Sequence, residues 1–235
     1  LNWTPLHLKI EEVATVAAFR LASAGLWIDH YKMTAHTALN RKLNKDKPWW
    51  SESDYIVPTY SFSRYFDVTI KEREDVVEGD YEDNGDGIIC FTDGSKSESG
   101  TGLGIFVPKL DIEISLNVGP NATVFQSEVK AIELCASELA SREIMNSDIR
   151  ICSDSQAALK ALKSYKFCSK TVRSCFEKLQ SLGILNRVTL VWVPGHCGFE
   201  GNEKADELAK SKLNELVPDL VLPVSQCLVK GKIRE

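Results

Sequence analysis

The chain has 235 residues, which is enough for one or two domains. Hydrophobic residues make up 43% and charged residues 26%, a composition that excludes a disordered or fibrous chain. No run of 18 apolar residues occurs, so the sequence predicts no membrane span. The seven cysteines form no Cys-x-x-Cys pair, and we expect buried free thiols in an intracellular compartment, the cytoplasm or the nucleus.

The net charge of −5 is unevenly distributed along the chain. Residues 71–86 hold eight acidic and two basic residues, whereas residues 155–187 hold seven basic residues and one acidic residue. A basic stretch of this kind can contact phosphates even when the whole chain is acidic. The composition therefore does not exclude a nucleic-acid substrate.

The N-terminal third of the chain has the weakest pattern. Residues 1–45 have apolar side chains at helical spacing and are predicted to be helical. Residues 46–86 contain two prolines, the Trp49–Trp50 pair and the acidic run, with no sustained period. We expect this second segment to be a linker or a loosely packed extension.

A regular pattern of strands and helices begins at Gly87. Three strands with short turns come first, and helices then alternate with two more strands, which predicts an α/β fold with a mixed five-stranded sheet flanked by helices. The predicted strands cover residues 87–92, 100–108, 111–118, 148–153 and 187–193, and the predicted helices cover residues 123–142, 155–165, 170–182 and 201–213.

Two aspartates come directly after predicted strands. Asp93 follows the strand at 87–92, and Asp154 follows the strand at 148–153. Ligands of open α/β sheets bind beyond the carboxyl ends of parallel strands, so both side chains are expected at one edge of the sheet. For Asp154 a simpler interpretation is also open, because an aspartate at this position could cap the helix predicted at 155–165.

Two further acids lie on helix faces that should be apolar. Glu128 is four residues before Ile132, and Asp206 is three residues before Ala209, so both belong to stripes that should face the sheet. For any one acid, a structural hydrogen bond is an equally good interpretation. Four acids at one sheet edge, without a fixed basic partner in any of their segments, favour a hard divalent cation held by oxygen ligands.

Four segments of the chain resemble the four motifs of the ribonuclease H family, in the family's order. They are residues 91–95 (Phe-Thr-Asp-Gly-Ser), 126–132 (Gln-Ser-Glu-Val-Lys-Ala-Ile), 153–157 (Ser-Asp-Ser-Gln-Ala) and 193–206, which begins Val-Pro-Gly-His. The fourth segment also has the family's ten-residue step from His196 to Asp206. The resemblance implies the RNase H-like fold and a metal-dependent endonuclease that hydrolyses the RNA strand of RNA–DNA hybrids.

The resemblance also implies roles for single residues. Asp93, Glu128, Asp154 and Asp206 match the family's catalytic, metal-binding acids, and His196 matches its active-site histidine. The implied cofactor is a pair of Mg²⁺ ions, with Mn²⁺ as the alternative. Asp93 would contact both ions, Asp206 the ion beside the attacking water, and Glu128 with Asp154 the other ion. Glu128 would also accept a hydrogen bond from an RNA 2′-hydroxyl, and His196 would shuttle a proton or aid product release.

We expect further residues to contact the RNA–DNA hybrid. Two belong to the motifs and four to the basic stretch, whose simpler interpretation is a solvated helix face. They are Ser95, Gln126, Lys163, Lys166, Lys170 and Arg173. The short link between the helices of the basic stretch leaves no room for the bulky basic protrusion of some family members.

Some segments resemble one branch of the family, the RNase H domains of non-LTR retrotransposon polyproteins. Residues 123–126 and 192–196 are typical of that branch, and residues 4–28 resemble the region that follows its reverse transcriptase. A neighbouring reverse transcriptase domain is therefore the expected partner, and the missing initiator Met agrees with a polyprotein fragment. The expected division is an extension at 1–86, an RNase H domain at 87–217 and a tail at 218–235.

Two other functions stay open on the sequence. The chain could be a non-catalytic nucleic-acid-binding or scaffold domain, although acids at all four motif positions argue against this. It could also be a DNA-cutting nuclease built on the same fold, such as an integrase or resolvase relative, which fold class alone does not exclude. The four motifs together, and the spacing of the fourth, favour ribonuclease H.

Overall fold

The computed structural model describes residues 5–23, 53–71, 87–195 and 197–234. The chain divides into two compact units, one of residues 1–58, 168–170 and 223–235 and the other of residues 59–167 and 171–222. In the described part of the chain, every helix is too short or too polar to cross a membrane.

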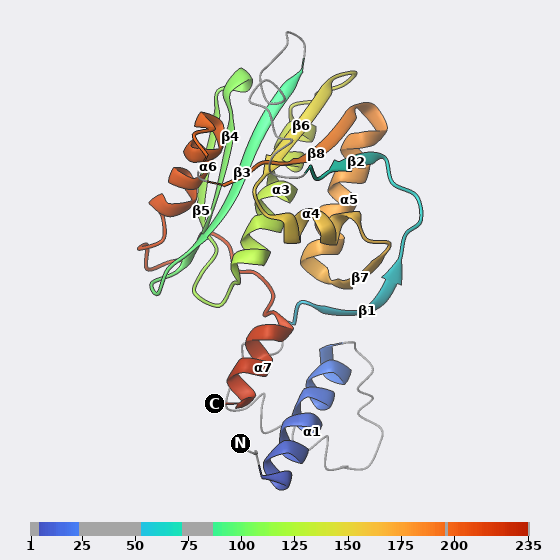
Figure 1. Ribbon diagram of the computed structural model, residues 1–235, viewed down its shortest axis with the longest axis vertical. Coiled ribbons are helices and arrows are strands. Elements are labelled where there is room, and N and C mark those ends of the chain that lie inside the picture. The colour runs from blue at the N-terminus through green and yellow to red at the C-terminus, as the bar shows by residue number, and fades with distance from the viewer. Residues whose placement is uncertain (1–4, 24–52, 72–86, 196, 235) are drawn as a thin grey trace. The chain divides into compact units, whose positions relative to one another are not determined.

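The larger unit is built on a mixed six-stranded sheet in the order β2-β8-β6-β3-β4-β5 (Figure 1). Strands β3, β4 and β5 form an antiparallel meander, while β6 runs parallel to β3, and β8 parallel to β6. The strands of this sheet are β2 (Phe66–Thr69), β3 (Ile88–Lys96), β4 (Thr101–Val107), β5 (Ile112–Asn117), β6 (Asp148–Ser153) and β8 (Arg187–Trp192). The predicted mixed sheet with flanking helices is confirmed, and one edge strand is added to it.

The added strand, β2, comes from the segment that was expected to be an irregular linker. It pairs in parallel with β8, with Phe66 opposite Val188. Phe66 is buried, and its ring meets the ring of Phe176 edge to face at 5.5 Å. A four-residue strand is too short to show a hydrophobic period, which explains why the sequence pattern missed it.

Four helices cover the sheet, and their bounds lie close to those predicted. They are α3 (Val124–Ser141), α4 (Gln156–Lys163), α5 (Lys170–Leu185) and α6 (Glu200–Ser211). Helix α3 begins where Thr123 and Gln126 form a capping box, a strong start signal. Helix α6 packs so closely on β4 that a Cβ at Gly104 would clash with the carbonyl oxygen of Ala205. Only glycine allows this approach.

A buried cluster on the α6 side of the sheet joins β3 to the start of α6. It contains Ile89, Phe91, Cys152, Val193 and Ala205. All seven cysteines are free, as expected, but only four are buried, because Cys168, Cys197 and Cys227 are exposed. The cluster fixes β3 and α6, the elements that carry two of the four predicted acids.

The smaller unit contains helices at both ends of the chain. Helix α1 (Leu6–Ser23) lies in the region predicted to be helical, and residues 24–45 of that prediction fall outside the described residues. Helix α7 (Gln226–Arg234) forms within the segment expected to be a tail, and Val224 and Val229 pack with Phe19 in a small core. Strands β1 (Tyr55–Tyr60) and β7 (Lys166–Ser169) pair in a separate two-stranded sheet, and each of these strands has residues in both units.

Candidate active site

Asp93 lies on β3 just beyond the last residue that pairs with β6, in the part of the strand that pairs with β4 alone. Parallel pairing with β6 stops at Thr92, opposite Ser153, while antiparallel pairing with β4 continues through Asp93 and on to Lys96. The prediction that the strand ends before Asp93 is therefore wrong by several residues, because the hairpin with β4 prolongs it. Asp93 is buried, and it still marks the end of the parallel part of the sheet.

Glu128 lies in the first turns of α3 and is buried against β3. The fit depends on Gly94, where a Cβ would lie 2.6 Å from the backbone nitrogen of Glu128. The amide of Gly94 also donates a hydrogen bond toward the Glu128 carboxylate. The other carboxylate oxygen, Oε2, is buried without a hydrogen-bond partner among the described residues. Glu128 thus occupies the sheet-facing position that its helical spacing predicted.

Asp154 follows β6 directly, and its side chain is partly exposed. The helix after it is capped by Ser155, whose hydroxyl accepts a hydrogen bond from the amide of Ala158. The alternative interpretation of Asp154 as the helix cap is therefore wrong. The loop after β8 passes close by, since a Cβ at Gly195 would lie 2.6 Å from Oδ2 of Asp154. Glycine at this position keeps the carboxylate accessible.

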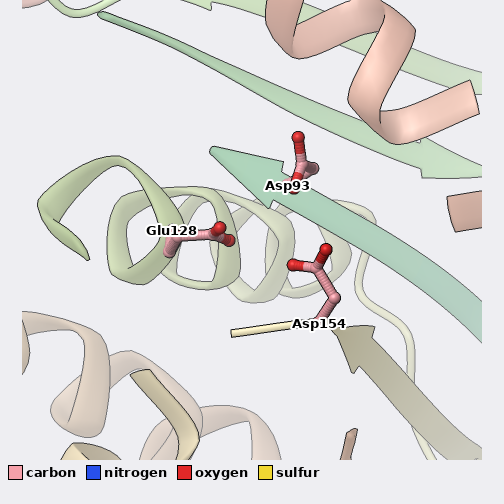
Figure 2. Close-up of side chains that lie close together, drawn as sticks. All are labelled: Asp93, Glu128 and Asp154. Carbon is pink, nitrogen blue, oxygen red and sulfur yellow. The ribbon is translucent and has the colours of Figure 1, made fainter. Parts of the chain in front are cut away.

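The three carboxylates meet at one corner of the sheet. One oxygen from each of Asp93, Glu128 and Asp154 lies within 4.8 Å of the others. Figure 2 shows Glu128 and Asp154 reaching toward one another, from the helix and from the strand end, beside Asp93. The spacing suits a shared cation, because carboxylate oxygens at this separation can ligate one ion or two adjacent ions.

Burial and mutual repulsion change the acidity of these groups. Burial, followed by repulsion from Asp154 and Asp206, raises the pKa of Asp93 to about 7. Burial, followed by repulsion from Asp93 and Asp154, raises the pKa of Glu128 to about 10. A backbone hydrogen bond from Gly94 lowers both pKa values, and the charge of Lys210 also lowers that of Asp93, but these effects are smaller than those of burial and repulsion. Without a cation, this corner retains protons at neutral pH.

Asp206 lies on α6 and faces the same corner from the other side of β3. It is half-buried, and its negative charge raises the pKa values of both Asp93 and Glu128. It lies outside the 4.8 Å group, however, and its Oδ2 accepts a hydrogen bond from Lys210 Nζ at 2.6 Å. Lys210 was not singled out in the sequence, although its position four residues after Asp206 on one helix is a recognisable ion-pair signal.

The other residues predicted to belong to the site differ in their burial and contacts. His196 lies outside the described residues. Ser95 is half-buried on β3, two residues beyond Asp93. Gln126 is only 1% exposed, and its Oε1 accepts hydrogen bonds from the backbone and hydroxyl of Thr123. Gln126 thus belongs to the cap of α3, and its contact with the hybrid remains a prediction.

The four basic residues separate into two kinds. Lys163, Lys166 and Lys170 are exposed. Arg173 is half-buried, pairs with Glu177 at 2.6 Å and lies over the ring of Phe167. Phosphate contact remains a prediction for the lysines, whereas the contacts of Arg173 are those of a structural residue.

Comparison with known proteins agrees with this geometry. The family model for RNase H matches residues 85–214, more than half of the chain. The chain belongs to the RNase H family. This match includes all four acids and both helices, α3 and α6, that carry acids into the site.

Individual relatives match over shorter segments. The chain is 48% identical over 44 residues to a ribonuclease H of Francisella philomiragia, and 47% identical over 45 residues to one of Francisella tularensis subsp. novicida. Each match covers 19% of this chain, and they cover 29% and 30% of those relatives, less than a third of their length. The crystal structure of an RNase H1 from Halobacterium salinarum superposes with a TM-score of 0.44 and 21% identity, over 54% of this chain and 97% of that one.

Proposed function

We propose that the chain is a metal-dependent endonuclease that hydrolyses the RNA strand of RNA–DNA hybrids. Membership of the RNase H family supports this substrate, and the cluster of Asp93, Glu128 and Asp154 supports the reaction. The observation that carries the proposal is the convergence of the three carboxylates, with one oxygen of each within 4.8 Å of the others and Glu128 Oε2 buried without a hydrogen-bond partner among the described residues. A buried carboxylate in these surroundings is costly unless a cation neutralises it.

The donor set fits a hard divalent ion, and we assign Mg²⁺ to it. Asp93, Glu128 and Asp154 would hold the metal through oxygen atoms, with Asp206 as a fourth ligand from α6. Bound divalent ions lower the pKa of a water and stabilise the leaving oxygen of a phosphodiester. Ligation requires ionised carboxylates, so Asp93 and Glu128 must release protons when the metal binds near neutral pH.

The protein's own residues would select and orient the hybrid. Glu128, ionised by the metal, can accept a hydrogen bond from an RNA 2′-hydroxyl, which DNA lacks. Exposed Lys163 and Lys166 can contact phosphates without regard to sequence. By the resemblance of its motif, His196 would shuttle a proton or aid product release. We further assign the chain to a retroelement polyprotein, with a reverse transcriptase domain as its neighbour and an intracellular location.

A cleavage assay with three duplexes tests the function. Labelled RNA–DNA hybrid, double-stranded RNA and double-stranded DNA are incubated with the protein, with Mg²⁺ or with EDTA. We expect cuts only in the RNA strand of the hybrid and only with metal. Binding of the hybrid without cleavage would identify a non-catalytic domain instead, and cleavage of double-stranded DNA would identify another nuclease of the same fold.

A further inference from the structure

Three aromatic rings are exposed together on the larger unit, two from the segment before β2 and one from the turn before β7. The exposed fractions of Tyr60, Phe62 and Tyr165 are 59%, 80% and 57%. Phe62 stacks on both tyrosines, with centroid distances of 6.4 Å to Tyr60 and 6.0 Å to Tyr165 and interplanar angles of 11° and 30°. We call these three residues the aromatic platform. Single exposed aromatic residues are common, but a stacked and solvent-facing group of three is not.

Hydrogen bonds hold the platform in place from both sides. The amide of Ser61 donates to the carbonyl of Tyr165 at 3.0 Å, and Arg64 Nη1 donates to the carbonyl of Lys163 at 3.0 Å. These bonds tie the segment before β2 to the turn after α4. The rings are therefore exposed on an anchored backbone, which is how a preorganised binding surface is built.

Basic residues predominate in the two segments that carry the platform. Residues 59–66 and 155–176 contain basic residues and no acidic residue, although the whole chain carries a net charge of −5. Lys160, Lys163 and Lys166 are exposed close in sequence to Tyr165. Stacked rings beside exposed lysines match the two parts of a nucleic-acid strand, because bases stack on aromatic faces and phosphates attract cations.

We propose that the aromatic platform binds unpaired nucleotides of a nucleic-acid strand that extends beyond the hybrid duplex. The occupant is single-stranded because a duplex hides the faces of its bases, whereas an unpaired strand exposes them. Tyr60 and Phe62 lie outside residues 85–214, whereas Tyr165 lies inside them, so the platform combines the chain's own extension with the region matched by the family. The proposal goes beyond hybrid cleavage and does not depend on the metal site.

The test measures binding of the full chain to fluorescent single strands, oligo-dT and oligo-U, by anisotropy in EDTA, where no metal-dependent cleavage occurs. Phe62→Leu keeps an apolar side chain but removes the ring, and it should weaken binding at least about fivefold for each strand type that the platform accepts. Phe62→Tyr keeps the ring and should bind like the wild type. Tyr65→Leu is the matched control, because Tyr65 is 56% exposed in the same segment and lies outside the stacked group.

Thermal unfolding checks that each variant folds, and little change is expected because Phe62 is mostly exposed. The wild type should bind a hybrid with an unpaired tail more tightly than a blunt hybrid, and Phe62→Leu should bind the two hybrids equally. Equal loss in Phe62→Leu and Tyr65→Leu, or no loss in Phe62→Leu for either strand type, would overturn the proposal. The platform would then be left to a protein partner, such as a neighbouring domain.

Discussion

Helix α3 carries two buried glutamates in contrasting surroundings. Glu128 and Glu133 are each 5% exposed and lie five residues apart. Oε1 of Glu133 accepts hydrogen bonds from Lys130 and from Ser174, both at 2.9 Å. Glu128 instead faces the carboxylates of Asp93 and Asp154, and these raise its pKa. Both glutamates have a buried Oε2 without a hydrogen-bond partner among the described residues, but Glu133 has the positive charge of Lys130 beside it, whereas Glu128 lies beside negative charges.

The difference shows that burial alone does not identify a functional acid. A buried carboxylate with a lysine partner stabilises the fold, whereas one among like charges makes the folded state less stable until a cation arrives. Natural proteins tolerate such a cost at sites that bind something. The contrast between Glu128 and Glu133 therefore supports the metal site more strongly than the number of acids does.

The largest effect is expected from Asp93→Asn. Asn keeps the shape of the side chain but removes the charge at the centre of the three carboxylates, so hybrid cleavage should fall about a thousandfold or more. Circular dichroism should show an unchanged fold. Asp111→Asn is the control, because Asp111 is an exposed acid in a left-handed conformation that Asn also tolerates. Normal cleavage by the Asp93 variant, purified in the same way, would refute the assignment.

The comparison of the two glutamates predicts opposite changes in stability. In metal-free protein, Glu128→Gln should raise the free energy of unfolding by about 2 kcal/mol near pH 8, or Tm by about 5 °C, because the ionised Glu128 of the unfolded chain must take up a proton to fold and Gln need not. Glu133→Gln should lower it by about 1 to 3 kcal/mol, because Lys130 loses its counter-charge. Thermal unfolding in EDTA measures both changes.

The pH dependence of the Glu128 effect has a definite sign. The pKa of Glu128 is about 10 in the folded state, against 4.5 without its surroundings. Folding therefore favours the protonated form, and the unfavourable contribution grows as the pH rises above about 4.5. Glu128→Gln should be close to neutral near pH 4 and increasingly stabilising toward pH 8. Equal effects at both pH values, or destabilisation at pH 8, would contradict the conclusion that Glu128 lies among like charges with no cation to neutralise them.

The sequence predicted which acids come together better than it predicted the contacts of the residues around them. Asp93, Glu128 and Asp154 were identified because strand ends and helix periodicity determine which elements bring their side chains to one sheet edge. For Gln126 the sequence analysis missed one role, because its side chain also completes the capping box of α3. The contacts of a side chain depend on residues distant in sequence or on local helix caps, and hydrophobic periodicity predicts neither of these.

Strand β2 and the aromatic platform were missed for a related reason. Tyr60 and Phe62 lie in a short segment with no period, and the stacking of Phe62 on Tyr165 joins parts of the chain that are about a hundred residues apart. Glu128 and Glu133 also look alike in sequence, since the lysine that distinguishes them is effective only through a side-chain contact. Sequence located the acids, but their partners required the three-dimensional structure.

Lys163 and Lys166 form a region of like positive charge that can be compared with the cluster of like negative charge at Asp93, Glu128 and Asp154. Lys163 and Lys166 repel one another as the acids do, but water screens them, so they cost little when nothing is bound. If they contact phosphates, the double change to Ala should weaken binding to hybrids of any sequence about tenfold. The slope of log affinity against log salt should flatten by up to about 0.9 for each phosphate that is no longer neutralised. An unchanged salt slope would show that the lysines are only a solvated surface.

The smallest effect is expected at Lys210, a cation that the chain itself brings to the acidic corner. Lys210 Nζ pairs with Asp206 at 2.6 Å, and its charge lowers the pKa of Asp93. A bound metal would share those carboxylates, so Lys210 competes with it for negative charge. Lys210→Gln should therefore tighten Mg²⁺ binding about two- to fivefold, a modest change because the lysine is largely exposed.

Isothermal titration of Mg²⁺ into the protein measures this change, and Lys212→Gln is the matched control. Lys212 pairs with Asp219 and Glu215, away from the three clustered acids, so its loss should leave the metal affinity unchanged. Weaker Mg²⁺ binding in Lys210→Gln would instead show that the lysine holds Asp206 in position for the ion. Equal tightening in both variants would show only a change in net charge. Tightening confined to Lys210→Gln would place Asp206 in the metal site together with the three clustered carboxylates.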